Sequence, residues 1–140
     1  MIITDIHQLK RKCMPVKSMP RGIEIGNKLL KYLKQEKSGV GLAANQIGID
    51  ARVCVVKVGA PIILVNPVIK GKFEKITFQE GCLSFPGDYI LTERYANIAV
   101  SADNHERTLF FSYEKNALEC VCVQHEIDHL DGITMYDRSI

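Results

Sequence analysis

The stretch QHEIDHLDG, at 124–132, carries side chains whose types and spacing suit a metal site. On a helix, residues four apart lie one turn above the other, so His125 and His129 can offer imidazole nitrogens to one ion at about 2.0 to 2.1 Å. Glu126 then lies beside that ion. Because the same spacing also occurs by chance on helices that bind nothing, the interpretation needs a third ligand.

Cys82, in the stretch QEGCLSFPGD, is the candidate for that ligand. It lies between a strand expected to end near Phe78 and a turn at Pro86-Gly87, a position from which a strand edge can present a ligand. Two histidines and one thiolate leave a fourth position open for water, as catalytic metal sites require. Cys13 and Cys54 suit a buried core, and Cys120 points away from the histidine face. Cys122 is three residues before His125 and so lies near the site, but a helix cannot easily bend it onto the same ion.

The helix that holds the two histidines is predicted to begin at a capping box of Asn116 and Glu119 and to end before Gly132. Its apolar residues lie nearly all round, which predicts burial against sheet on several sides. Buried polar side chains are costly unless they are paired or bind metal, so this helix favours a site. Five upstream runs are typical of strands, at 52–58, 61–69, 72–78, 97–103 and 106–112.

Short turns between these runs leave no room for crossover helices, so antiparallel neighbours are predicted. An amphipathic surface helix is predicted over 23–37, followed by a glycine-rich, shaped loop at 39–48. The expected fold is α+β, with mainly antiparallel β-sheets packed around a central C-terminal helix that carries HEIDH. The length of 140 residues predicts a single domain over 1–140.

Composition argues against several functional classes. Hydrophobic residues at 46% and charged residues at 24% match a soluble globular protein, and no apolar run approaches the roughly 20 residues of a membrane span. A formal net charge of +2 is too small to indicate nucleic-acid binding. The N-terminal residues lack the apolar block of an export signal, and five cysteines fit free thiols or a metal ligand better than a disulfide framework. We expect a cytoplasmic protein with no membrane association and no sequence-specific nucleic-acid partner.

Three segments together resemble the peptide deformylase family. GVGLAANQ at 39–46, EGCLS at 80–84 and QHEIDHLDG are similar to its three motifs, in the same order, and the resemblance runs from about residue 9 to residue 137. It implies a hydrolase that removes the N-formyl group from the N-terminal formylmethionine of newly synthesised polypeptides, releasing formate. HEIDH alone would also suit a general metallopeptidase, which does not require the other two motifs. A non-catalytic module with a structural metal would need a fourth protein ligand, for which the sequence offers no candidate.

The resemblance implies one divalent ion bound by Cys82, His125 and His129. Ferrous iron is expected in the cell, and zinc, nickel or cobalt in purified protein. Glu126 is implied as the base and then the acid that carries the proton. The family's oxyanion donors match the side-chain amide of Gln46 and the backbone N–H of Leu83.

The substrate, an N-formylmethionyl peptide of a nascent chain, is expected to bind extended, like an added strand. Only eight residues follow Gly132, whereas long bacterial members continue into a C-terminal helix associated with ribosome contact. Weak ribosome contact and a monomer are therefore expected. Compact forms of this kind occur among phage-encoded members, which would act in the cytosol of an infected bacterial cell. The substrate-binding residues implied by the family are Val40, Gly41, Gly81, Leu118, Val121 and Cys122, with Arg94 at the pocket rim.

Overall fold

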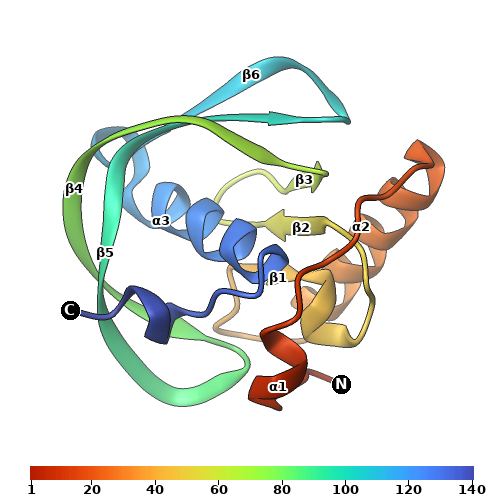
Figure 1. Cartoon of the computed structure of the whole chain (residues 1–140), viewed down its shortest axis with the longest axis horizontal. Coiled ribbons are helices and arrows are strands. Elements are labelled where there is room, and N and C mark those ends of the chain that lie inside the picture. Colours follow the sequence, from red (N-terminus) through yellow and green to blue (C-terminus); the bar gives the residue numbers. More distant parts are fainter.

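The computed structural model describes residues 1–140, which form two three-stranded antiparallel sheets and two main helices (Figure 1). The first sheet has the order β1-β2-β3, with β1 at Gly41–Ala43, β2 at Val53–Val56 and β3 at Ile62–Val65. The second has the order β4-β5-β6, with β4 at Val68–Cys82, β5 at Phe85–Ala102 and β6 at His105–Ser112. The helices are α1 (Ile6–Leu9), α2 (Met19–Lys34) and α3 (Tyr113–Leu130), with short 3-10 helices η1 (Ala44–Ile47) and η2 (Met135–Arg138).

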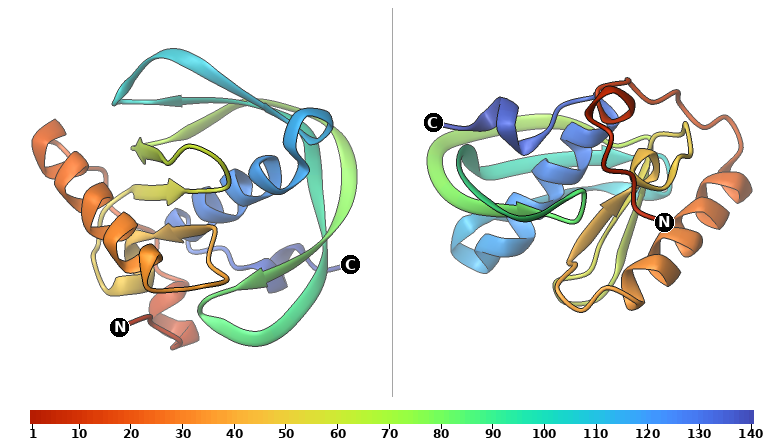
Figure 2. Two further views of the ribbon diagram at one scale, coloured as in Figure 1. Left: turned by 180° about the vertical axis from the view of Figure 1, so that it is seen from behind. Right: turned by 90° about the horizontal axis from the view of Figure 1, so that it is seen from below.

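The first sheet is buried on both faces. Along β2, Val53 and Val55 pack with residues of α2, whereas Cys54 and Val56 join the core around α3. This explains why β2 is a continuous apolar run without polar alternation. Helix α3 in turn contacts strands of both sheets. The layers therefore follow the order α2, first sheet, α3 and second sheet (Figure 2).

Strands β4 and β5 form a long hairpin that curves around α3 (Figure 1). The hairpin turns at Leu83-Ser84, where Cys82 pairs with Phe85. Between this pair and the next, Glu80 with Ile90, the register shifts and residues 86–89 form a bulge without partners on β4. The bulge leaves Cys82 at the tip of the hairpin.

Helix α3 is buried at every position from Cys120 to Leu130. Asn116 leaves the helical conformation (φ −159°, ψ 97°), and its Oδ1 accepts a hydrogen bond from the N–H of Glu119 at 3.0 Å. The long regular part of the helix thus begins at the predicted cap, after one extra turn. At the other end Gly132 has φ +73°, and a Cβ there would lie 2.3 Å from the carbonyl oxygen of Lys10, so only glycine fits.

The structure confirms the predicted α+β class with α3 at its centre. The boundaries of the second sheet were predicted wrongly, because β5 begins at Phe85 rather than at residue 97. The strand continues past the bulge at Pro86 and Gly87, which are locally typical of a turn, and pairs with β4 again from Ile90. No helix combines the length and apolar character needed to cross a membrane.

Two further differences lie in the first half of the chain. Residues 41–43, expected in a loop, form β1, because Gly41 and Ala43 pair with Val56 and Cys54 of β2. Helix α2 begins at Met19 rather than near residue 23. Its first turn is capped by Ser18, and a proline is tolerated there because the first N–H groups of a helix have no helical partner.

Candidate active site

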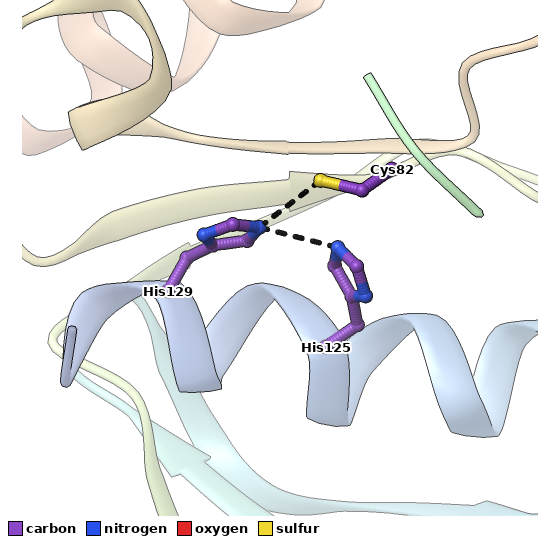
Figure 3. A group of neighbouring side chains, drawn as sticks. All are labelled: Cys82, His125 and His129. Atoms are coloured by element: carbon purple, nitrogen blue, oxygen red, sulfur yellow. Dashed lines mark hydrogen bonds between the residues drawn. The ribbon is translucent and has the colours of Figure 1, made fainter. Parts of the chain in front are cut away.

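The side chains of Cys82, His125 and His129 point toward one another (Figure 3). Cys82 comes from the end of β4, and α3 presents the two histidines one turn apart. Sγ of Cys82 lies 3.4 Å from Nε2 of His129, which lies 3.2 Å from Nε2 of His125. All three donor atoms lie within 4.8 Å of one another.

These separations fit one tetrahedral ion. Nitrogens bound at about 2.0 to 2.1 Å with tetrahedral angles lie about 3.4 Å apart, and a thiolate at about 2.3 Å lies about 3.6 Å from each nitrogen. The two contacts of Nε2 of His129, with Sγ of Cys82 and with Nε2 of His125, are within a few tenths of these values. One thiolate and two imidazoles form a donor set that zinc, iron, nickel and cobalt accept. The three residues therefore form a candidate metal centre.

The ring of His125 is held from behind by a buried carboxylate. Oε1 of Glu80 lies 2.8 Å from Nδ1 of His125, and the guanidinium of Arg94 donates to both oxygens of Glu80. Burial alone raises the pKa of Glu80, but the hydrogen bonds from Arg94 and His125 outweigh it and lower the pKa to about 2. An ionised Glu80 accepts the Nδ1 proton of His125, which leaves Nε2 with its lone pair toward the site.

The network continues from Arg94 to the surface. Nη1 of Arg94 donates to Asp128 at 2.5 Å, and Asp128 also accepts from Nε and Nη2 of Arg138 at 3.0 Å each. Arg94 is only 3% exposed and does not line the cleft. Its expected place at the pocket rim is therefore corrected, because Arg94 shares the inner face of β5 with Thr92 and points behind the metal centre. Tyr89, on the bulge, lies at the cleft instead.

His129 is supported differently. Nδ2 of Asn45 donates to the main-chain oxygen of His129 at 2.7 Å. Its ring atom Nδ1 is buried and has no hydrogen-bond partner. Burial, followed by the nearby His125, lowers the pKa of His129 well below its usual value, so the ring is neutral and able to bind metal.

Glu126 is a buried carboxylate beside the two histidines. It is 3% exposed, its Oε1 has no hydrogen-bond partner, and its Oε2 accepts only a long contact of 3.9 Å from Sγ of Cys122. Burial is the main cause that raises the pKa of Glu126 to about 7. A carboxyl group with this pKa can take up and release a proton near neutral pH.

Gln46 directs its amide nitrogen at the same centre. Its Oε1 accepts from the N–H of Ala43 at 2.9 Å, which fixes the orientation of the amide. Nε2 then donates to Oγ of Ser84 at 3.0 Å and lies 3.6 Å from Sγ of Cys82. Leu83 lies beside Cys82 in the hairpin turn and lines the same cleft.

A cleft of about 420 Å³ opens over this centre. Gly41 of β1 lies against its floor, because a Cβ there would be 2.6 Å from both Sγ of Cys122 and Oε2 of Glu126. Leu118 lies at the mouth with 40% of its surface exposed, whereas Val121 is buried. The cleft brings together the predicted residues Val40, Gly41, Gln46, Gly81, Cys82, Leu83, Leu118, Val121, Cys122, His125 and Glu126.

Sequence reasoning did not single out the residues that support this centre. Glu80 carried a signal, because it belongs to EGCLS and a glutamate among buried positions needs a partner. Asn45 lies within GVGLAANQ and Ser84 within EGCLS, but no spacing rule connects them to His129 or Gln46. Only the three-dimensional arrangement shows these contacts.

Comparisons with known proteins identify the family of this chain. The sequence model for polypeptide deformylase matches residues 2–140. The peptide deformylase of Hydrogenovibrio crunogenus is 39% identical over 135 residues, covering 93% of this chain and 79% of its own. That of Desulfitobacterium hafniense is 41% identical over 133 residues, covering 94% of this chain and 87% of its own.

Solved structures show the same fold. A probable peptide deformylase from a Synechococcus phage has a TM-score of 0.86 at 32% identity, covering 99% of this chain and 98% of its own. The peptide deformylase of Thermus thermophilus has a TM-score of 0.88 at 33% identity, covering 100% of this chain and 84% of its own. With matching sequence and fold, the chain belongs to the peptide deformylase family, metal-dependent hydrolases that remove the N-formyl group from newly made polypeptides.

Proposed function

We propose that this protein deformylates N-formylmethionyl peptides in the bacterial cytosol, with Cys82, His125 and His129 as the metal ligands and Glu126 as the proton carrier. One observation carries the assignment: three donor atoms within 4.8 Å of one another lie beside a buried carboxylate with a free oxygen. A divalent ion held by these residues would supply Lewis acidity, which lowers the pKa of water toward neutrality and polarises a carbonyl group. Ferrous iron is the ion we propose for the cell.

Glu126 moves the proton in this proposal. Its carboxylate accepts a proton from the attacking water and then delivers it to the departing amine of the peptide. The pKa of about 7 suits both steps, because the group is neither locked in the charged form nor in the neutral form near neutral pH. Oε1 has no competing hydrogen-bond partner, so it is free to make this contact.

Gln46 and Leu83 stabilise the negative charge that develops on the formyl oxygen. Nε2 of Gln46 can serve because its amide is held by Ala43 and Ser84 and does not have to reorganise during the reaction. The backbone N–H of Leu83 is the second donor that we propose. Both residues line the cleft that contains Glu126.

The peptide binds along β1. This strand pairs only with β2, so its other edge can accept an added strand in the manner of β-augmentation. Val40 and Gly41 offer main-chain contacts there, and Gly41 leaves room because it has no side chain. The methionine side chain enters the apolar part of the cleft, which is lined by Leu118, Val121 and Cys122.

Formate release from formyl-Met-Ala-Ser tests the reaction. Protein loaded anaerobically with Fe²⁺ is expected to release one formate per peptide and to leave acetyl-Met-Ala-Ser unchanged. Cleavage of internal peptide bonds without formate release would instead identify a general metallopeptidase. Parallel Ni²⁺ and Zn²⁺ preparations test the metal, and a zinc form that matches or exceeds the iron form would contradict the proposed iron.

A further inference from the structure

We propose that Asn45 is a positioning residue for the metal ligand His129: one buried water accepts the Nδ1 proton of the ring and donates to Oδ1 of Asn45. The inference rests on the proposed metal centre and adds to it a residue on η1, outside the cleft. It assigns to Asn45 the task that Glu80 performs for His125.

The first observation concerns buried polar atoms that have no hydrogen-bond partner. Three buried side-chain nitrogen or oxygen atoms lack a hydrogen-bond partner, and they are Oδ1 of Asn45, Oε1 of Glu126 and Nδ1 of His129. The reaction uses the oxygen of Glu126. The remaining two are one acceptor and one nitrogen, on residues already joined by a hydrogen bond of 2.7 Å from Nδ2 of Asn45 to the main-chain oxygen of His129.

The chemistry of the ring requires an acceptor at this place. Nε2 of His129 faces Cys82 and His125, and Nδ1 lies on the opposite side of the ring (Figure 3). A neutral imidazole that gives the lone pair of Nε2 to a metal must carry its proton on Nδ1. A buried N–H without an acceptor is costly, and metal-binding histidines almost always donate this proton to a nearby oxygen.

The orientation of the Asn45 amide is fixed by its other contact. Nδ2 must face the carbonyl oxygen of His129, because a carbonyl accepts but does not donate. Oδ1 is therefore an acceptor that the main chain of His129 does not use. Neither Oδ1 nor Nδ1 has a hydrogen-bond partner within the protein, and one buried water that donates to Oδ1 and accepts from Nδ1 would satisfy both atoms.

The two histidines are then held by acceptors of different kinds. A carboxylate, Oε1 of Glu80 at 2.8 Å, holds His125, whereas a neutral amide holds His129. A neutral acceptor fixes the ring and its tautomer without adding a further negative charge beside the thiolate of Cys82. Asn45 thus limits the total charge of the centre while it orients the ligand.

Two variants and one control separate this role from a purely structural one. Asn45→Ala removes both the donor to the His129 carbonyl and the acceptor for its ring. Asn45→Asp keeps an acceptor and removes only the donor. Asn104→Ala is the control, because Nδ2 of Asn104 also donates to a main-chain oxygen, that of Ile63 at 2.8 Å, at a place remote from the metal centre.

The first measurement is the Co²⁺ affinity of the apoprotein, determined by competition with a chelator. The second is the NMR signals of the histidine ring N–H groups in zinc-loaded protein labelled with ¹⁵N-histidine. Asn45→Ala is expected to lower Co²⁺ affinity about 10- to 100-fold and to lose the slowly exchanging Nδ1–H signal of His129, but not that of His125. Asn45→Asp is expected to keep that signal and to bind Co²⁺ more tightly than Asn45→Ala does, whereas Asn104→Ala is expected to match the wild type in both measurements.

Wild-type affinity and an unchanged His129 signal in Asn45→Ala would overturn the proposal. Equal losses in Asn45→Asp and Asn45→Ala would also overturn it, because the bond to the carbonyl would then explain the whole effect. Failure of the wild-type protein itself to bind one Co²⁺ would instead overturn the metal centre on which the proposal rests. Far-ultraviolet circular dichroism of each variant shows that the folded protein is being compared.

Discussion

Oε1 of Glu80 lies 2.8 Å from Nδ1 of His125, although the two residues are 45 positions apart in the sequence. The contact joins the end of β4 to the middle of α3, so it ties the strand that carries Cys82 to the helix that carries both histidines. Arg94 compensates the charge of the same carboxylate and in turn binds Asp128 on α3. The metal centre is thus built on a buried ionic network that already links its two elements.

Glu80→Gln is expected to weaken this link in two ways. Loss of the carboxylate leaves the buried guanidinium of Arg94 without its main partner, which costs about 3 to 5 kcal/mol in the free energy of unfolding. A poorer acceptor for His125 lowers metal affinity about 10- to 100-fold. Urea unfolding of the apoprotein and Co²⁺ competition measure the two effects.

The control for this variant is Glu93→Gln on β5, the strand paired with β4. Glu93 is 47% exposed in its side chain and pairs with Lys75 at 3.5 Å, so its loss is expected to change the free energy of unfolding by about 0 to 1 kcal/mol. Equal stability of the Glu80 and Glu93 variants would show that the buried network does not support the centre.

Glu80 also predicts how the apoprotein responds to acid. Its pKa falls from an ordinary value of 4.5 to about 2 on folding, so the folded state binds fewer protons than the unfolded state between these pH values. The stabilisation is fully present above pH 4.5 and is lost as the pH falls toward 2, by about 3 kcal/mol in all. The free energy of unfolding, measured across this window, should depend less steeply on pH in Glu80→Gln. Identical slopes would remove Glu80 as the cause.

Much of this centre could be predicted from residue types and order. Cys82, His125 and His129 were chosen because their chemistry and spacing suit one ion, and the structure brings their donor atoms together. Arg94 could not be placed, because the direction of a side chain on β5 depends on a register that pairing with β4 sets. The contact of Asn45 with His129 could likewise not be predicted from the sequence, because it joins segments 84 residues apart.

In the fold, too, nearby residues predict some features, whereas pairing between distant segments determines others. The predicted contact of Asn116 with the N–H of Glu119 and the glycine after the helix at Gly132 follow from local chemistry and are present. The start of α3 was predicted one turn too late, because the helix begins at Tyr113 and is capped by Ser112. The long extent of β4 and β5 does not follow from local propensity, because Gly81, Pro86 and Gly87 interrupt it. The full extent of both strands depends on their pairing with each other, which local propensity does not reveal.

Glu126→Gln is expected to keep the metal and to lose most turnover. The amide is nearly isosteric with the carboxylate but cannot accept the proton, and removal of general acid-base catalysis costs roughly 10²- to 10⁴-fold in rate. Formate release from formyl-Met-Ala-Ser measures turnover, and metal analysis of the same sample measures occupancy. Near-wild-type turnover at unchanged occupancy would exclude Glu126 as the proton carrier.

Cys82→Ala is expected to lower metal occupancy, because it removes one of three ligands and the negative charge of the thiolate. Cys13→Ala and Cys54→Ala are the matched controls, since both thiols are buried in the core around α3. They should retain the metal content of the wild type. Elemental analysis of the purified proteins compares all three, and full occupancy in Cys82→Ala would mean that another group is the third ligand.

Gly41→Ala tests whether the close approach of β1 to α3 matters for the reaction. The added Cβ would lie 2.6 Å from Oε2 of Glu126 and 2.6 Å from Sγ of Cys122, so Glu126 or β1 must shift. A displacement on the order of 1 Å of a reacting group can cost about 10²-fold in rate, and we expect a loss of that size in kcat/KM on formyl-Met-Ala-Ser. Gly59→Ala is the control, because no atom lies within 4 Å of a Cβ at that position. Equal kcat/KM values for the two variants would show that Glu126 can move without loss, which would weaken its assignment as a closely placed proton carrier.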